Sequence, residues 1–497
     1  MNSSDESSAL NHLGLSSNAL IDALMGSGIP LPRRQHPEAE VEALLESIDS
    51  CTDVETLVAG IKTDLKSVLE DADLTKHNSD QKEGEDGPTK HQQTSPPIAT
   101  ISARLTRIKS LLYKERTMNS NAFAFFKNSQ FKTFASALLH SILLNDEREA
   151  LIPQLLENLE ILPFESRKDV ASIFNYLLVC GCAVNGVVGT EQNDSAIESY
   201  TKTMLGFVFY VNAHFSLILN PIVKGHFVSS LENSHKDPKE KSDTDITESV
   251  RNVQMFKPMD VALHCGSMFR SILRHPLLYN QLVSEDNIFP FVYPFLDVFA
   301  NQANFEVSSD ALETLRLIMH PGSSNIAIPT VSLESKHDTI VSIQKIESAM
   351  EAIEANFLDR DFDNIFTRFN NNLLTEKHAN YVTRRISLQL LSSILLSRSN
   401  YKVMIKYISV RSNLRTIMIL LSDPSAHIQM EAFNVFKIFV ANPTKPNDII
   451  KILVDNKIKL IKYLTSLHQE KEATDSQFRE EKALVISTLE NLEMTTE

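Results

Sequence analysis

The chain has little of the glycine that tight β-turns need. Only 13 of its 497 residues are glycine, and none follows Gly322. Two-residue β-hairpin turns usually require glycine at a position with positive φ. This scarcity therefore argues against hairpins in the C-terminal part of the chain and favours an all-α structure there.

Cysteine is equally scarce. Cys51, Cys180, Cys182 and Cys265 provide neither a disulfide framework nor the paired CxxC sets of a zinc site. Cys180 and Cys182 are separated by one residue, whereas a zinc knuckle or redox pair has two. We interpret them as buried thiols and expect no metal and no cofactor.

Positive charge is also limited. Lysine and arginine total 48 against 63 acidic residues, a formal net charge of −15, and no basic run exceeds short pairs such as Arg384-Arg385. Neutralising nucleic-acid phosphates takes clustered cations, so we expect no nucleic-acid partner. The N-terminus lacks a basic region followed by an apolar one, so no signal peptide is expected.

Residues 203–223 contain no Asp, Glu, Lys or Arg and suggest a membrane span at first sight. Asn212, Asn220 and Pro221 interrupt this stretch, and its flanks carry no topology signal. A buried helix explains the segment better. We therefore expect a cytoplasmic protein without membrane insertion.

What the chain does contain is a helical repeat within residues 380–443. Residues 387–391 align with 432–436, and 394–395 with 439–440, an offset of 45 residues. Two- and three-helix solenoid repeats have periods of roughly 40–47 residues. Apolar side chains at i, i+4, i+7, i+8 and i+11 form one helical face in the second copy, with Asp423 and Pro424 predicted to start that helix. This face consists of Ile428, Ala432, Val435, Phe436 and Phe439.

The same small residue recurs upstream at Ala171, Ala262 and Ala311. The intervals from Ala171 through Ser387 to Ala432 are 91, 49, 76 and 45 residues. Two intervals match one period, and the longer two contain polar insertions; the 91-residue interval alternatively holds an extra degenerate repeat. We predict a right-handed α-solenoid of armadillo/HEAT-like repeats.

The predicted organisation is a disordered tail over 1–38 followed by one helical-repeat domain over 39–493. Polar insertions are predicted at about 73–98, 229–255 and 321–340, because these stretches are poor in apolar residues. Helices are predicted within 39–72, from 101 onward, at 381–396 and, as the closing helix, at 476–492.

No catalytic motif is present. The chain lacks a phosphate-binding GxxxxGK[ST], a GxSxG, an HExxH and the kinase signature set. Asp359, Asp361 and Asp363 have the spacing of the first three ligands of a calcium-binding loop. However, Asn364 replaces the required glycine and Asn370 the bidentate glutamate, so we expect no calcium site and no enzyme.

One candidate surface lies on the predicted helix at 381–396. Tyr381, Arg385, Gln389 and Ser392 fall at i, i+4, i+8 and i+11 and share one face. The plain interpretation is a solvated strip. The functional alternative is a partner-binding surface, because tyrosine and arginine are frequent interface anchors.

A second candidate surface centres on Met418, with Arg398 and Arg415 nearby in the sequence. Methionine at helical spacing usually fills a core. The alternative is an adaptable apolar pocket rimmed by arginines, which suits an aromatic side chain beside a carboxylate.

These residues resemble the calcium-binding protein 39 family of armadillo-like kinase scaffolds. The similarity is dense over 380–469, where it includes NYVTRR, LLSSILL, NLRTIMILL and IQMEAFNVFKIFVANP. It continues upstream in FESRKDVASIF, VALHCGSMFRSILRH and FEVSSDAL. The resemblance implies a non-enzymatic scaffold whose concave face binds a Ste20-related protein kinase or pseudokinase and holds its regulatory αC helix in the active position.

The resemblance also implies which residues make these contacts. Phe305, Tyr381 and Arg385 match concave contact positions of the family, and Gln389 stands where a lysine is usual. The implied role is signalling for cell polarity or growth. The alternative is a helical-repeat adaptor for transport or cytoskeletal cargo.

A separate C-terminal pocket is implied to accept a Trp-Glu-Phe tail of the partner, which is aromatic and acidic. Met418 matches the floor of this pocket, and Arg398 and Arg415 match basic positions around it. Asp455 stands where a basic residue is expected, which would alter the preference for the tail.

Overall fold

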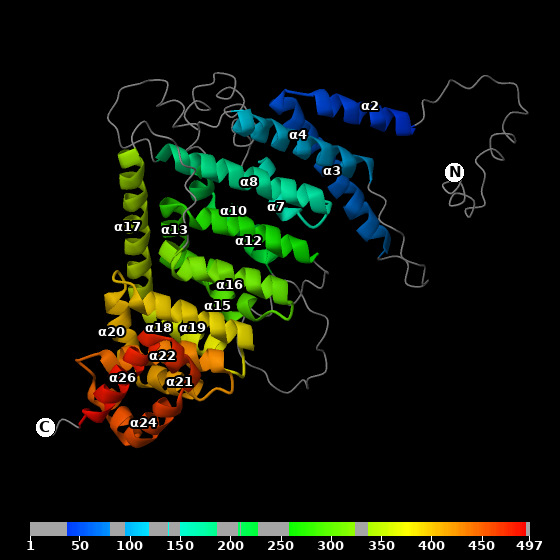
Figure 1. Ribbon diagram of the computed structural model, residues 1–497. Coiled ribbons are helices and arrows are strands. Elements are labelled where there is room, and N and C mark those ends of the chain that lie inside the picture. Colours follow the sequence, from blue (N-terminus) through cyan, green and yellow to red (C-terminus); the bar gives the residue numbers. More distant parts are fainter. Residues whose placement is uncertain are drawn as a thin grey trace, which may run out of the picture. The chain divides into compact units, whose positions relative to one another are not determined.

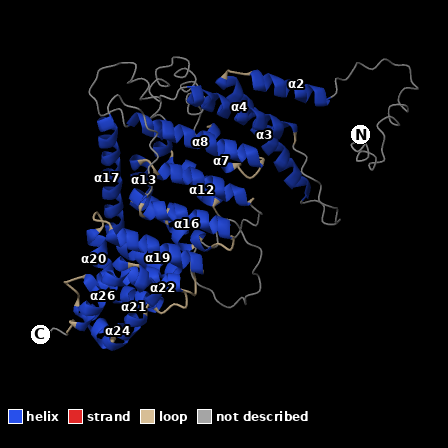
Figure 2. Cartoon of the chain, viewed as in Figure 1, coloured by secondary structure: helices blue, strands red, loops and turns tan. Residues whose placement is uncertain are grey.

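The computed structural model describes residues 37–79, 95–118, 138, 150–185, 207–208, 210–226, 258–323 and 336–493. Every regular element in these ranges is helical, and none is a strand (Figure 2). The predicted all-α helical-repeat class is therefore confirmed. The described residues fall into two units, one ending at Ser47 and the other beginning at Ile48. Most of the first helix, α2 (Pro37–Ser50), belongs to the first unit, and everything below concerns the second.

Among the described residues, helices of the second unit pack side by side in chain order and form a stack (Figure 1). Each helix contacts the next, because the small and apolar residues of each repeat face a neighbour. In order, the stack consists of α3 (Val54–Ser79), α4 (Pro96–Met118), α8 (Phe164–Asn185), α12 (Met259–Leu273), α16 (Phe305–Met319), α19 (Tyr381–Leu396), α22 (Ala426–Ala441) and α26 (Ser476–Glu490).

Shorter helices pack against the stack and against one another. Thus α10 contacts α12, α15 contacts α16, α20 contacts α19, and α21 contacts α22. The long α17 contacts α13, α18 and α20 (Figure 1). These helices are α7 (Leu151–Glu157), α10 (Phe215–Gly225), α13 (Pro276–Leu282), α14 (Glu285–Phe291), α15 (Tyr293–Asp297), α17 (Lys336–Arg360), α18 (Phe362–Phe369), α20 (Tyr401–Ser409), α21 (Arg411–Leu421), α23 (Asn447–Asp455), α24 (Lys457–Ser466) and α25 (Gln469–Thr474). Short 3-10 helices occupy η1 (Phe299–Asn301) and η2 (Pro321–Ser323), and a short π-helix occupies η3 (Asn370–Leu374).

The small residues that define the repeat lie where stacked helices approach each other. Ala171, Ala262, Ala311, Ser387 and Ala432 are all buried. They stand on α8, α12, α16, α19 and α22, which are consecutive in the stack. A small side chain at this position lets neighbouring helices come close, which explains why it recurs.

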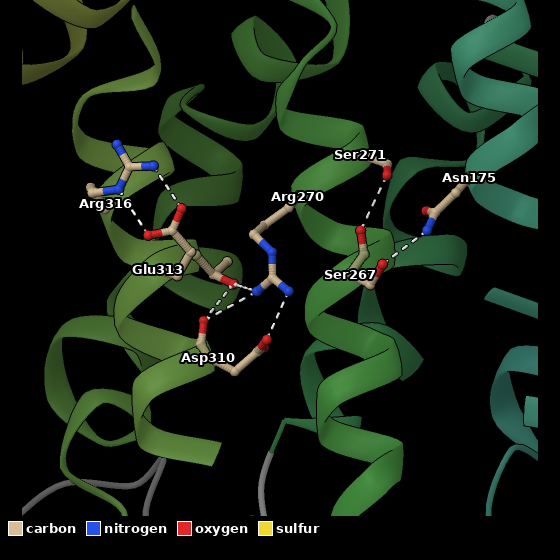
Figure 3. A network of polar contacts seen from close by, with 8 residues as sticks. Asn175, Ser267, Arg270, Ser271, Asp310, Glu313 and Arg316 are labelled. Carbon is tan, nitrogen blue, oxygen red and sulfur yellow. Dashed lines mark hydrogen bonds and ion pairs between the residues drawn. The ribbon is translucent and has the colours of Figure 1, made fainter. Parts of the chain in front are cut away.

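Ion pairs connect neighbouring helices of the stack. Each pair joins a basic residue on one helix to an acidic residue on an adjacent helix and so fixes the two relative to each other. The pairs are Arg104–Asp64, Lys109–Asp169, Arg167–Asp260, Arg270–Asp310 and Lys437–Glu481. Figure 3 shows Arg270 of α12 beside Asp310 of α16, with Nη2 2.7 Å from Asp310 Oδ1. Its Nη1 atom also donates to the Thr314 hydroxyl at 2.9 Å.

The predicted start of α22 was wrong. The helix begins at Ala426, and Asp423 precedes it without serving as the N-cap. The Oδ1 atom of Asp423 accepts a hydrogen bond from the Ser425 amide at 2.9 Å, and its other oxygen pairs with buried Arg384. Asp423 therefore lies two residues before the N-cap Ser425, and its carboxylate bridges Arg384 and the Ser425 amide.

Several predicted polar segments are shorter than expected where the structure describes them. Helix α3 continues to Ser79, α4 begins at Pro96, and α17 begins at Lys336. Polar but helix-forming residues lengthen a helix end, and composition alone does not separate such an end from a loop. Residues 1–36, 80–94, 229–255 and 324–335 lie outside the described residues, as do the side chains of Cys180 and Cys182.

No described helix is long and apolar enough to cross a membrane. Within the uncharged stretch 203–223, the described part includes most of α10, where Phe215, Ile218, Leu219 and Ile222 are buried. This agrees with the prediction of a buried helix.

Gly266 marks a close approach of α12 to α16. A Cβ atom there would overlap the Oδ2 atom of Asp310 and lie 3.0 Å from Nη1 of Arg270. We expect Gly266→Ala to lower the free energy of unfolding by about 1–3 kcal/mol, because the ion pair must shift. Chemical denaturation followed by circular dichroism measures this. Gly322→Ala is the control, since its nearest neighbour would be 3.6 Å away; equal stability of both variants would contradict the expectation.

Candidate partner-binding surface

Two exposed aromatic residues begin neighbouring helices of the stack. Phe305 is the first residue of α16 and 63% exposed, and Tyr381 is the first residue of α19 and 39% exposed. An asparagine caps each helix: Asn304 accepts from the Val307 amide at 3.1 Å, and Asn380 from the Thr383 amide at 2.9 Å. The two aromatics therefore occupy equivalent places on helices that contact each other.

Arg385 lies one turn beyond Tyr381 on α19 and is half-buried. Its guanidinium has no hydrogen bond or ion pair within the described part of the chain, and its Nε atom is buried without a partner. Arginine is costly to desolvate unless it is paired. An unpaired, partly desolvated guanidinium is therefore well prepared to receive a carboxylate from another molecule.

Arg384, the residue before Arg385, lies in a different environment. Arg384 is buried and pairs with Asp423, and their side chains are 9% and 6% exposed. Thr383 is also buried, and its hydroxyl donates to the Ala300 carbonyl at 3.1 Å. Nothing in the local sequence indicates this internal polar cluster, because its partners lie far apart along the chain.

Gln389 is exposed, and Ser392 is half-buried. The Gln389 amide donates to Oε1 of Glu431 on α22 at 2.7 Å. Of the four residues predicted to form the contact surface, Gln389 is thus the one already held by a neighbouring helix. The others, Phe305, Tyr381 and Arg385, have exposed or unpaired groups on α16 and α19.

The second predicted site lies around α21. Met418 is half-buried on this helix, and Arg415, one turn before it, is exposed. Arg398 is exposed between α19 and α20. Neither arginine has an ion pair with another described residue. Asp455 is exposed at the end of α23, a helix that contacts α21.

Cavities in the part of the chain that the structure describes lie elsewhere. One of about 350 Å³ lies between α7, α10 and α12, and one of about 440 Å³ lies at the corner between α17 and α18, next to α20. Met418 lines neither. The second cavity includes the aspartates of the apparent calcium loop, where Asp359 pairs with Lys406 at 2.5 Å and Asp361 with Arg360 at 2.6 Å. No group of three or more potential metal ligands occurs among the described residues.

Stacked helices that display an aromatic-and-arginine surface define a helical-repeat protein of the scaffold or adaptor type. The comparisons with known proteins agree with this class. The model of the Mo25-like family matches residues 62–327 and 327–493. The chain therefore belongs to the Mo25-like family, which confirms the resemblance seen in its sequence.

Individual relatives come from distant organisms. The degreening-related gene dee76 protein of Auxenochlorella protothecoides is 32% identical over 342 residues, which is 69% of this chain and 79% of the relative. The calcium-binding protein 39-like protein of Homo sapiens is 30% identical over 345 residues, 69% of this chain and 77% of the relative. A Mo25-like protein of Schizosaccharomyces pombe is 36% identical over 240 residues, 48% and 62% respectively.

Proposed function

We propose that this chain is a non-catalytic cytoplasmic scaffold that binds and activates a Ste20-related protein kinase or pseudokinase in signalling for cell polarity or growth. The first contact surface consists of Phe305, Tyr381, Arg385 and Gln389. The observation that carries the proposal is the unpaired Arg385 guanidinium, one turn from an exposed tyrosine. Exposed aromatics and arginines supply most of the binding energy at protein interfaces.

Activation follows from selective binding. A kinase exchanges between inactive and active positions of its regulatory helix, and a scaffold that binds the active state more tightly increases its population. Helices α16 and α19, which carry the contact residues, pack against each other, so the surface loses little entropy when it binds.

The second contact is a pocket formed by Arg398, Arg415 and Met418, which binds a partner's C-terminal tail ending in Trp-Glu-Phe. The arginine guanidinium can donate two parallel hydrogen bonds to the glutamate carboxylate of the tail, and the flexible methionine side chain can pack against its aromatic rings. Two sites on one body reinforce each other through effective concentration, so each site alone need only be weak.

We expect Met418→Ala to weaken binding of a synthetic peptide ending in Trp-Glu-Phe by about tenfold or more, because the ring loses its apolar contact. Fluorescence anisotropy with a labelled peptide measures the affinity. Arg385→Ala is the matched control and should bind the peptide like the unchanged chain. Unaltered peptide binding by Met418→Ala would refute the pocket.

The partner class is tested separately. Affinity purification of the tagged full chain from its own cells, followed by mass spectrometry, should identify a Ste20-related kinase or pseudokinase. Recovery of transport or cytoskeletal proteins without any kinase would instead support an adaptor for other cargo.

A further inference from the structure

A short π-helix touches both helices that carry the proposed contact residues. This element, η3 (Asn370–Leu374), directly follows α18 and contacts α19, which carries Arg385, and α21, which carries Met418. It begins with three successive asparagines, residues 370–372. Asparagine is a poor helix former, and π-helical turns are rare and frequently mark functional sites. A locally unfavourable sequence of this kind indicates that its side chains have a role elsewhere.

Asn370 belongs to a closed ring of hydrogen bonds among three residues, which we call the Asn370 network. Its Nδ2 atom donates to Oδ1 of Asn413 on α21 at 2.9 Å, and its Oδ1 atom accepts from the hydroxyl of Tyr407 on α20 at 2.9 Å. The ring closes where Nδ2 of Asn413 donates to the Tyr407 carbonyl at 3.0 Å. All three residues are buried, and none of their buried side-chain nitrogen or oxygen atoms lacks a partner. A fully satisfied buried network holds its elements in one arrangement.

The same helix corner occurs between α13 and α14 without this network. Asn287 and Asn413 are each the third residue of their helix. Each donates to the carbonyl of the residue six positions earlier, at 2.8 Å and 3.0 Å. Among the described residues Asn287 has no hydrogen bond to a third helix, whereas Asn413 also accepts from Asn370. The corner bond alone therefore suffices to join two helices, and the network adds a separate link at the helix that carries Met418.

The π-helix is also connected to the first turn of α19. The carbonyl of Asn372 accepts from Nδ2 of Asn301 in η1 at 2.8 Å. The carbonyl of Ala300, also in η1, accepts from the hydroxyl of Thr383 on α19 at 3.1 Å. Hydrogen bonds thus connect α19 to η1, η1 to η3, and η3 to α21. The elements that carry the two proposed contacts are therefore joined through the protein interior.

We propose that Asn370, Tyr407 and Asn413 are positioning residues that hold α21 in the place where the pocket for the partner's tail is formed. The pocket combines Arg398, which follows α19, with Met418 of α21, so its shape depends on how α21 lies relative to α19. Two linked contacts reinforce each other only where the geometry lets both form at once. The inference rests on the proposed function, since it takes the tail to bind at this pocket. The network residues are buried and touch no partner themselves.

A pair of tyrosine substitutions tests the role of the network. Tyr407→Phe removes only the hydroxyl and leaves Oδ1 of Asn370 without its donor. We expect its affinity for the labelled peptide ending in Trp-Glu-Phe to fall about three- to tenfold, measured on the full chain by fluorescence anisotropy. Tyr279→Phe on α13 is the matched control, because it removes an equally buried hydroxyl that donates to the Ile318 carbonyl at 2.8 Å. It should lower the denaturation midpoint similarly and leave the affinity unchanged.

The two corner asparagines provide a second matched pair. Asn413→Ala removes both the corner bond and the link to η3, whereas Asn287→Ala removes only a corner bond. We expect the first to weaken peptide binding and the second to leave it unchanged. Circular dichroism without denaturant establishes that each variant is folded under the conditions of the binding assay.

Amide hydrogen exchange of the free full chain gives a readout that does not need the peptide. We expect Tyr407→Phe to speed exchange in α21, and Tyr279→Phe to leave exchange in α21 unchanged. Exchange in α21 that is equal in the two variants would overturn the positioning role.

Two binding results would also overturn the inference. Peptide binding by Tyr407→Phe as tight as that of the unchanged chain is the first. An equal loss of affinity in Tyr279→Phe is the second, because the loss would then reflect general destabilisation. If the unchanged chain does not bind the peptide at all, the pocket of the proposed function is refuted. Exchange in α21 then decides the network alone: faster exchange in Tyr407→Phe than in Tyr279→Phe supports its role in holding α21, and equal exchange refutes it.

Discussion

Arg384→Ala is expected to lower the free energy of unfolding by about 3–5 kcal/mol, the largest stability effect that we predict for a single substitution. Arg384 and Asp423 are almost completely enclosed, with side chains 9% and 6% exposed. Removal of the guanidinium leaves the carboxylate buried without its counter-ion, and an uncompensated buried charge is costly. Chemical denaturation followed by circular dichroism measures the loss.

The matching control is a double-mutant cycle. Asp423→Ala should be similarly harmful, because it leaves the buried arginine unpaired. The double variant should be clearly more stable than the sum of the single losses predicts, because neither charge then remains alone. Strict additivity would show that the two side chains do not depend on each other, contrary to the buried pair.

Arg385→Ala is expected to abolish activation of a Ste20-related kinase while the chain stays folded. Its guanidinium has no partner within the described residues, so its loss should change stability by no more than about 0.5 kcal/mol. Loss of one member of a buried charge pair at an interface costs about 2–5 kcal/mol of binding energy. The phosphorylation rate of a kinase substrate, with and without the scaffold variant, measures the effect.

Arg385→Lys serves as the graded control for that assay. Lysine keeps the positive charge but lacks the planar fork that binds a carboxylate through two hydrogen bonds, so an intermediate rate is expected. Full activation by Arg385→Ala, with binding as tight as that of the unchanged chain, would remove Arg385 from the proposed contact surface. We thus expect substitution of Arg384 to lower the free energy of unfolding, and substitution of the adjacent Arg385 to weaken binding of the kinase.

The local parts of the fold could be predicted from the sequence. The helix predicted over 381–396 is α19 (Tyr381–Leu396), and the closing helix predicted over 476–492 is α26 (Ser476–Glu490). The apolar residues and the capping residues that determine these two helices lie close together in the sequence. The recurrence of small residues from Ala171 to Ala432 likewise identified the positions where stacked helices meet.

Interactions between distant residues could not be predicted in this way. Arg384 and Asp423 are 39 positions apart, and Gln389 and Glu431 are 42 apart. Helical spacing placed Arg385 on one face with Tyr381, but nothing in the local pattern says that Arg384 is buried against Asp423.

Amide hydrogen exchange of the full chain, alone and bound to its cognate kinase, tests the central claim most directly. We predict slower exchange in the peptides that contain the first turns of α16 and α19, around Phe305 and Tyr381, and in those around Met418. Protection confined to α13, α14 and α15, with no change in α16 and α19, would contradict the proposed contact surface.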